Sequence, residues 1–228
     1  MPVFLLTDAM EFPPPHLAAR DGLLAVGGDL SVKRLIFAYR MGIFPWFSEG
    51  DPILWWSPDP RLVLYPNEIK ISKTLKKIIK KKTFNVTMDL AFKEVINQCA
   101  QARLQNNQGT WLVKDMIDAY CKLHRSGFAH SVEVWQQGEL AGGLYGVSLG
   151  KCFFGESMFT RVSNASNVGL VKLSNYLNEL SFELIDCQVT TEHLIRFGAR
   201  EIPRPLFLDQ LKVSLGAPTH RGKWEFKG

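Results

Sequence analysis

The sequence predicts an α+β fold with a mixed β-sheet, divided into a small N-terminal α/β domain (residues 1–62) and a larger C-terminal domain (residues 63–228). Two observations carry this prediction. The stretch from Ser131 to Phe159 alternates between apolar and polar residues and is interrupted by turn residues, which is typical of antiparallel strands. Beyond it, helix and strand patterns alternate to the end of the chain, so further strands are expected to join the same sheet.

The first 60 residues are rich in proline, glycine and tryptophan, and they contain one clear helix signal. Ser31 can cap a helix that ends near Met41, just before Gly42. Leu35 and Tyr39 would lie on its buried face. Short extended segments broken by prolines surround this helix, so we expect a small domain with a limited core of its own.

The larger domain is expected to form its elements in a regular order. The apolar periodicity and the turn residues predict a strand over residues 83–89, helices over 90–103 and 112–125, three strands within 131–159 with turns at Gln137-Gly138 and Leu149-Gly150, a helix from 164 or 166 to 180, a strand over 183–189, a helix over 190–198, a short strand over 199–202 and a final helix over 205–215.

Residues 70–82, "KISKTLKKIIKKK", carry seven lysines and no acidic residue. This segment contributes +7 to a chain of net charge +5, so the remaining residues sum to −2. Ile71, Leu75 and Ile78 recur at helical spacing, which would hold the lysines along one side of a helix. A concentrated basic surface is suited to a polyanion such as nucleic acid. A merely solvated lysine face is the alternative interpretation.

Several classes of protein are not indicated by the sequence. There is no G-x-x-x-x-G-K-[ST] and no G-x-G-x-x-G motif, so no nucleotide cofactor is expected. Cys99, Cys121, Cys152 and Cys187 form no C-x-x-C pair and the histidines are scattered, so we expect reduced thiols and no metal site. No secretory leader and no membrane-spanning stretch are indicated, which favours a cytoplasmic protein.

Glu156 is the most unusual residue of the predicted sheet, because it lies inside the apolar run "KCFFGESMFTR". An ionised carboxylate in apolar surroundings is costly unless a partner compensates it. The neighbouring Ser157 is a poor nucleophile candidate, since the G-x-S-x-G elbow lacks its closing glycine. Glu156 is therefore a candidate functional residue, and a glutamate paired with a core Arg or Lys is the structural alternative.

Seven blocks of the sequence, in this order, closely resemble the bacterial leucyl/phenylalanyl-tRNA–protein transferases: "GLLAVGGDL", "GIFPWFSEGDPILWWSPDPR", "HSVEVW", "GGLYGV", "FFGESMF", "NASN" and "LIDCQV". The resemblance extends from Gly22 to about Pro203. It implies a reaction in which Leu or Phe is moved from its charged tRNA to the α-amino group of a protein with N-terminal Arg or Lys, which marks that protein for degradation.

The same resemblance implies a C-terminal domain similar to the acetyl-CoA-dependent N-acetyltransferases. Those enzymes hold the CoA pyrophosphate on a Gln/Arg-x-x-Gly-x-Gly/Ala loop, and the equivalent segment "TRVSNASNVG" lacks this glycine spacing. A tRNA 3′ end in place of CoA accounts for the loss, so no cofactor is expected. A CoA-dependent N-acyltransferase and a catalytically silent tRNA-binding module are the two rival hypotheses.

Asp186, Gln188 and Glu156 are the catalytic candidates. Alternation along a strand would place Asp186 and Gln188 on one face and turn Cys187 to the other. The resemblance implies that Asp186 polarises Gln188 to act on the incoming amine, although Asp186 could itself take the proton. Glu156 would bind the aminoacyl-adenosine or a cationic acceptor terminus.

The resemblance also assigns binding residues. Five apolar residues would form the pocket for the Leu or Phe side chain: Leu144, Met158, Leu170, Leu173 and Ile185. Trp46 and Trp111 would contact the terminal adenosine, where stacking is worth about 1–3 kcal/mol per base. The tRNA backbone would lie on a set of lysines, which we name the lysine face: Lys73, Lys76, Lys77, Lys80 and Lys81. No dimerisation pattern is evident, and a monomer is expected.

Overall fold

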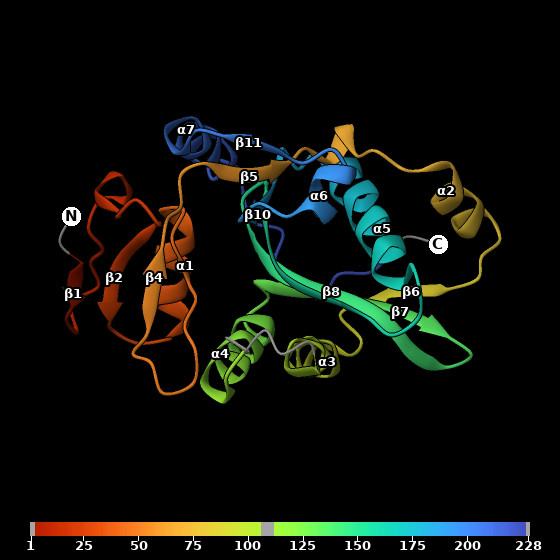
Figure 1. The fold of residues 1–228 in the computed structure, drawn as a ribbon, viewed down its shortest axis with the longest axis horizontal. Helices are drawn as coiled ribbons and strands as arrows, with labels where there is room; N and C mark the ends of the chain where they lie inside the picture. Colours follow the sequence, from red (N-terminus) through yellow and green to blue (C-terminus); the bar gives the residue numbers. More distant parts are fainter. Residues whose placement is uncertain (1–2, 106–111, 227–228) are drawn as a thin grey trace.

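The computed structural model describes residues 3–105 and 112–226, and it contains two mixed β-sheets with helices packed against them. Figure 1 shows the smaller sheet at the N-terminal end of the molecule and the larger sheet running through the rest of it. The predicted α+β class with a mixed sheet is confirmed.

The smaller sheet has four strands in the order β1-β2-β4-β3. Their bounds are Phe4–Leu6 (β1), Leu23–Gly27 (β2), Phe44–Pro45 (β3) and Leu54–Trp56 (β4). Helix α1 (Val32–Arg40) lies between β2 and β3 in sequence, and Ser31 caps it by accepting a hydrogen bond from the backbone N–H of Arg34 over 3.3 Å. The predicted cap and helix are both confirmed.

The larger sheet has seven strands in the order β11-β5-β10-β9-β8-β7-β6. Their bounds are Arg61–Leu64 (β5), Asn85–Met88 (β6), Ala129–Gln136 (β7), Glu139–Leu149 (β8), Cys152–Thr160 (β9), Leu184–Gln188 (β10) and Arg200–Ile202 (β11). Strands β9 and β10 form the parallel pair, and the other neighbours are antiparallel. Arg61 and Leu62 precede the expected domain boundary and nevertheless pair in this sheet with β10 and β11.

Helices cover both faces of the larger sheet (Figure 1). Helices α3 (Phe92–Gln105) and α4 (Lys114–Arg125) pack on one face, and α5 (Ala165–Glu179) packs on the other, with α2 (Lys73–Lys80) beside it. The chain is completed by η1 (Pro15–Leu17), η2 (Pro66–Glu68), α6 (Glu192–Arg196) and α7 (Arg204–Ser214). All of the predicted α-helices are present, within a few residues of their expected ends.

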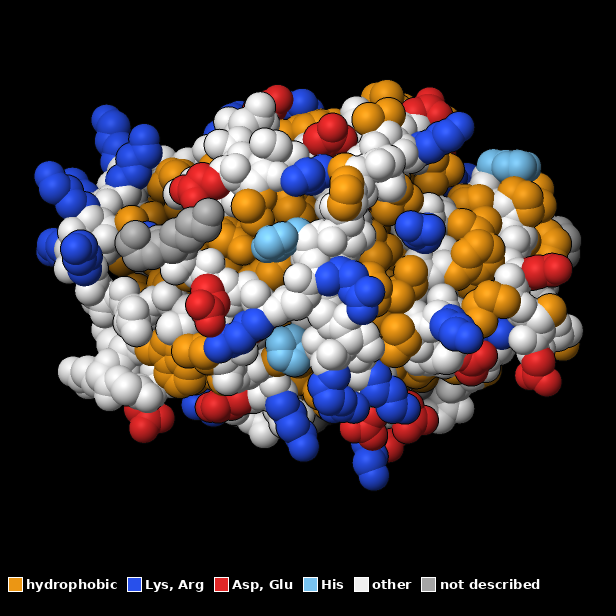
Figure 2. All heavy atoms as spheres, turned by 180° about the vertical axis from the view of Figure 1, so that it is seen from behind, with side chains coloured by type: hydrophobic (Ala, Val, Ile, Leu, Met, Phe, Trp, Pro, Cys, Tyr) orange, Lys and Arg blue, Asp and Glu red, His pale blue; other side chains and the backbone are white. Residues whose placement is uncertain are grey.

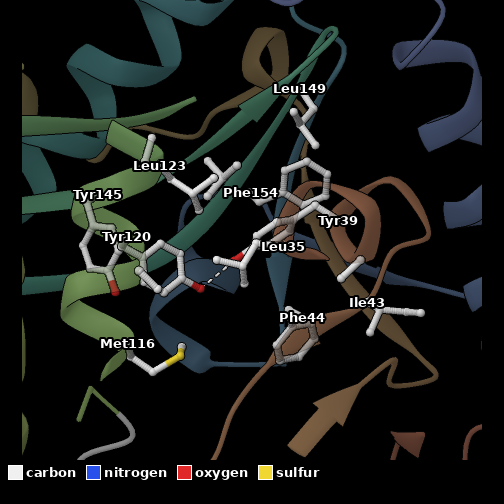
Figure 3. Packing of buried hydrophobic residues seen from close by; sticks show 14 of the residues in the cluster. Leu35, Tyr39, Ile43, Phe44, Met116, Tyr120, Leu123, Tyr145, Leu149 and Phe154 are labelled. Carbon is white, nitrogen blue, oxygen red and sulfur yellow. Dashed lines mark hydrogen bonds between the residues drawn. The ribbon is translucent and has the colours of Figure 1, made fainter. Parts of the chain in front are cut away.

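The two largest hydrophobic clusters lie on the two faces of the larger sheet. One cluster includes Leu144 and Phe153 and packs under α5, and the other includes Tyr145 and Phe154 and continues into the smaller sheet. Neighbouring residues of β8 and β9 therefore point to opposite faces, as expected for strands. In Figure 3, Tyr39 of α1 and Tyr120 of α4 meet beside Phe154. The two sheets thus share one continuous core.

Candidate active site

A cavity of about 280 Å³ opens where the carboxyl end of β10 meets β9 and β8. It is closed on one side by α5, on another by α6, and on a third by the residues around β3 of the smaller sheet. The cavity contains both apolar and polar walls, which is typical of a small-molecule site.

The apolar wall contains every pocket residue that the sequence predicted. Those five residues are Leu144 on β8, Met158 on β9, Leu170 and Leu173 on α5, and Ile185 on β10. Phe153 also lines this wall, although the sequence interpretation did not select it. Leu144, Met158 and Ile185 reach the cavity because their side chains lie on the α5 face of the sheet.

Glu156 lines the opposite, polar wall because a β-bulge turns it there. In the pairing of β8 with β9, Tyr145 lies opposite Ser157 and Gly146 opposite Gly155, so Glu156 has no counterpart on β8. A bulge of this kind bends the strand and redirects a side chain. Glycine is required opposite the bulge, since a Cβ at Gly146 would collide with the carbonyl oxygen of Phe154.

Three hydrogen-bond donors surround the Glu156 carboxylate. Tyr39 donates to Oε1 over 2.7 Å, Tyr120 donates to Oε2 over 2.7 Å, and the side-chain amide of Gln188 donates to Oε1 over 2.9 Å. Glu156 is only 7% exposed. Burial raises its pKa to about 7, and the hydrogen bonds from the two phenols and the amide oppose the rise only in part. A carboxyl group of this kind changes charge near neutral pH.

Tyr39 and Tyr120 are functional candidates that sequence reasoning missed. Tyr39 was expected on the buried face of its helix, and both tyrosines are fully buried. Their hydroxyls point toward one another across 2.6 Å (Figure 3). Burial and the neighbouring Glu156 carboxylate raise the pKa of both phenols, so they stay protonated and act as donors. The one sequence feature that could have indicated them was Glu156, because a buried carboxylate needs hydrogen-bond partners.

Gln188 reaches the cavity through an irregularity at the end of β10. Its φ is +63°, in the left-handed region, and the pairing of β10 with β5 shifts register between Asp186 and Gln188. Alternation therefore fails here: Cys187 and Gln188 both line the cavity, whereas Asp186 does not. Burial and the Asp186 carboxylate strongly raise the pKa of the Cys187 thiol, which keeps it a poor nucleophile.

Asp186 is fully buried and binds Arg61 through two hydrogen bonds, of 2.8 and 2.7 Å. Its Oδ1 also accepts the backbone N–H of Gln188 over 2.9 Å. The expectation that the Asp186 carboxylate contacts the Gln188 side chain is therefore wrong. Asp186 binds the backbone N–H of Gln188, and the side-chain amide of Gln188 binds Glu156. A core arginine was considered as an alternative partner for Glu156, but the structure pairs the core arginine, Arg61, with Asp186.

Trp46 lies at the mouth of the cavity with its side chain 41% exposed. Its ring lies 5.7 Å from that of Trp56, and the Trp56 indole N–H donates to the Trp46 carbonyl over 2.6 Å. An exposed, supported indole of this kind is suited to stacking on a base. Trp111, the second predicted adenosine contact, lies outside the described residues.

The lysine face lies on α2, at the end of the molecule away from the smaller sheet. All five of its lysines are exposed, while Leu75 is buried beneath them. Helix α2 lies at the right of Figure 1, and this end of the molecule is at the left of Figure 2, which is seen from behind. Lys and Arg side chains project from this end in Figure 2. The predicted amphipathic lysine helix is therefore present, separated from the cavity by α5.

Two other features are absent from the part of the chain that the structure describes. No group of three His, Cys, Asp or Glu side chains within residues 3–105 and 112–226 could hold a metal ion. No helix in the same residues is both long enough and apolar enough to cross a bilayer.

Comparison with known proteins decides the family. The family model described as "Leucyl/phenylalanyl-tRNA protein transferase" matches residues 63–212, and the model of that enzyme's N-terminal domain matches residues 28–59. The chain belongs to this family. The leucyl/phenylalanyl-tRNA–protein transferase of Desulforapulum autotrophicum is 55% identical over the full length of both chains. That of Syntrophobacter fumaroxidans is 58% identical over 99% of this chain and 96% of its own.

The chain is thus a tRNA-dependent aminoacyltransferase, and the enzyme class predicted from the sequence is confirmed. Among solved structures, an aminoglycoside acetyltransferase from a soil metagenomic sample overlaps 49% of this transferase and 86% of its own chain, with a TM-score of 0.35 and 16% identity. The "L-PGS" structure from Bacillus licheniformis overlaps 87% of the transferase and 66% of its own chain, with a TM-score of 0.42 and 10% identity.

Proposed function

We propose that this transferase moves Leu or Phe from the 3′-terminal adenosine of its tRNA to the α-amino group of a protein that begins with Arg or Lys. The observation that carries the proposal is the two-sided cavity. Its apolar wall suits the side chain of the transferred amino acid, and its polar wall of Glu156 and Gln188 suits an ammonium group. The product would carry a new N-terminal residue that marks it for degradation.

The aminoacyl group is bound by its side chain and by its adenosine. We assign Leu144, Met158, Leu170, Leu173 and Ile185 to the side chain. Apolar pockets distinguish related side chains by only about 1–3 kcal/mol per methylene, so use of both Leu and Phe is reasonable. Trp46 stacks on the adenine at the cavity mouth, and the predicted second contact from Trp111 remains part of the proposal.

The acceptor terminus is bound by the polar wall. A carboxylate that accepts hydrogen bonds and changes charge near pH 7 can orient an ammonium group and take one proton from it. The freed amine attacks the ester carbonyl carbon, a peptide bond forms, and the ester C–O bond breaks. The second amine proton leaves with the ribose oxygen. Glu156 and Gln188 contact the reacting amine in this scheme, whereas Asp186 acts through the backbone of Gln188.

The lysine face binds the phosphate backbone without reading sequence, which allows several tRNA bodies to be used. The enzyme acts as a cytoplasmic monomer without a cofactor. The chain comprises a small N-terminal domain and a catalytic domain, expected as residues 1–62 and 63–228. The division falls at residues 57–60 in place of residue 62, because β4 ends at Trp56 and β5 begins at Arg61.

The test supplies Leu-tRNA labelled in its leucine together with a peptide that begins with Arg. Label should appear on this peptide, and none on the same peptide with an acetylated α-amine. Glu156→Ala, and Asp186→Ala combined with Gln188→Ala, should each lower the rate by about 10²-fold or more. Tyr65→Phe is the matched control, since the Tyr65 hydroxyl bonds to Gln210, outside the residues that line the cavity. Failure of the wild type to label the peptide would refute the proposal.

Two further measurements distinguish this function from the two rival hypotheses. Acetyl-CoA in place of Leu-tRNA should give no acyl-peptide, and turnover with it would favour a CoA-dependent acyltransferase. Binding of Leu-tRNA without any transfer would instead favour a silent tRNA-binding module.

A further inference from the structure

Arg61 is a buried cation with an unusual set of neighbours. Its side chain is 1% exposed, and its guanidinium carbon lies 4.9 Å from the ring centre of Phe44 and 4.6 Å from that of Phe207. Within the described part of the chain, its Nη1 atom is buried without a hydrogen-bond acceptor. Burying an arginine is costly unless a charge compensates it, and the compensating charge is the Asp186 carboxylate.

Asp186 links Arg61 to the residues of the cavity. Its Oδ1 accepts both the Arg61 Nε–H and the backbone N–H of Gln188. The latter contact holds Gln188 in a left-handed conformation, which costs a non-glycine residue about 1 kcal/mol or more. That conformation places the Gln188 amide 2.9 Å from Glu156. Hydrogen bonds therefore connect Arg61 through Asp186 and Gln188 to Glu156.

We infer that Arg61 is a positioning residue for the transfer reaction: by fixing both oxygens of Asp186, it sets the backbone at Gln188 and so directs the Gln188 amide to Glu156. The inference rests on the proposed function of the polar wall. It gives Arg61, which does not line the cavity, a role through two intermediate residues.

The pair also has an electrostatic effect on Glu156. The charge of Asp186 is among the causes that raise the pKa of Glu156, and Arg61 supplies the opposing charge beside it. Without Arg61, the Asp186 charge acts on Glu156 without an opposing charge beside it. Within the described residues, the titratable groups around this pair and Glu156 include Cys152, Cys187, Arg204, Tyr39, Tyr120 and Tyr145.

The experiment compares Arg61→Met and Arg61→Lys with the wild type in the Leu-tRNA and Arg-peptide assay. Arg61→Met should lower kcat by about 10- to 100-fold, leave KM for Leu-tRNA unchanged, and move the acid limb of the pH–rate profile to higher pH. Arg61→Lys retains the charge but has one ammonium in place of the two-point contact, so it should recover part of the rate. It also serves if Arg61→Met does not fold.

Arg34→Met is the matched control. Arg34 is likewise buried and donates through Nε to a carboxylate, that of Asp29 at 3.0 Å, but it lies on α1 and outside the cavity wall. This variant should lose stability without a change in kcat per folded enzyme or in the pH profile. Equal pH shifts in the Arg34 and Arg61 variants would mean that Arg61 is merely structural and would overturn the inference.

A second measurement does not depend on turnover. The titration of Glu156, followed by carbon NMR with labelled glutamate and assigned with Glu156→Gln, should move upward by about one pH unit in Arg61→Met. An unmoved Glu156 titration would overturn the inference even if the wild type failed to transfer leucine. Failure of transfer by the wild type would refute the proposed function only, so the two failures are distinguishable.

Discussion

The hydroxyl oxygens of Tyr39 and Tyr120 lie 2.6 Å apart, and each lies 2.7 Å from a different oxygen of Glu156. These three oxygen–oxygen contacts need three protons, and the two phenols supply one each. In the ionised state both phenol protons point to the carboxylate, so the contact between the two hydroxyls is left without a proton. The phenols therefore lower the pKa of Glu156, in opposition to burial, which raises it to about 7.

Removing one phenol should make Glu156 harder to ionise. Tyr39→Phe and Tyr120→Phe each delete a hydrogen bond that lowers the pKa of Glu156. A hydrogen bond to a charged group is worth about 1.5–3 kcal/mol, which corresponds to about one to two pH units. The acid limb of kcat/KM against pH should move upward by that amount. Tyr65→Phe should leave it in place, and an unshifted limb in both active-site variants would contradict the prediction.

Glu156 should also make stability depend on pH in an identifiable direction. Its folded pKa of about 7 lies above its ordinary value of 4.5. Its stabilising contribution is therefore fully present below about pH 4.5 and is lost as the pH rises through about 7. The unfolding free energy of the wild type minus that of Glu156→Gln should fall by about 2–3 kcal/mol from pH 5 to pH 8.

Urea unfolding at the two pH values measures this difference. Because all other titrating groups are common to both proteins, subtraction removes their contributions. A difference that stays constant, or that grows with pH, would show that Glu156 is not the buried acid described.

The size of the apolar wall should set the choice between Leu and Phe. Leu170→Phe fills the cavity and should lower kcat/KM for Phe-tRNA relative to Leu-tRNA by about 10-fold or more. Competition between the two charged tRNAs measures the ratio. Leu177→Ala is the control, because Leu177 is buried on the same helix but does not line the cavity, and it should cost stability without changing the ratio.

Loss of the lysine face should weaken tRNA binding and flatten its salt dependence. Gln at Lys76, Lys77, Lys80 and Lys81 removes up to four phosphate contacts, each of which contributes about 0.7–0.9 to the slope of log K against log salt. A control with the same change of net charge places Gln at four exposed lysines on other helices: Lys93, Lys114, Lys122 and Lys212. Equal slopes for the two variants would mean that total charge, and not this face, attracts tRNA.

Most helices and strands could be predicted because their signals are local. The Ser31 cap of α1 and the apolar stripe of α2 are readable from a few neighbouring residues. Strand β5 was not separated from the proline-rich segments before it, since Leu62, Val63 and Leu64 are all buried and show no alternation. A strand buried on both faces has no period for the sequence to display.

The site was predictable in its types of residue and not in its contacts. Glu156 was conspicuous as an acid in an apolar run, and the apolar wall followed from the resemblance. Its partners Tyr39 and Tyr120, and the Arg61–Asp186 pair, join segments far apart in the chain, which no periodicity reports. The irregularities at Glu156 and Gln188 interrupt the two-residue repeat, so strand parity wrongly placed Gln188 on the same face as Asp186.

The phenol of Tyr39 has a consequence for how such enzymes can be recombined. It reaches Glu156 from α1, upstream of every strand in the larger sheet, and Trp46 and Arg61 also precede residue 63. A fragment that begins at residue 63 would keep Glu156 and Asp186 but would lose Tyr39, which binds the first, and Arg61, which binds the second. Chimaeras that exchange the first 60 residues between relatives would therefore also exchange Tyr39 and Trp46, which are part of the site.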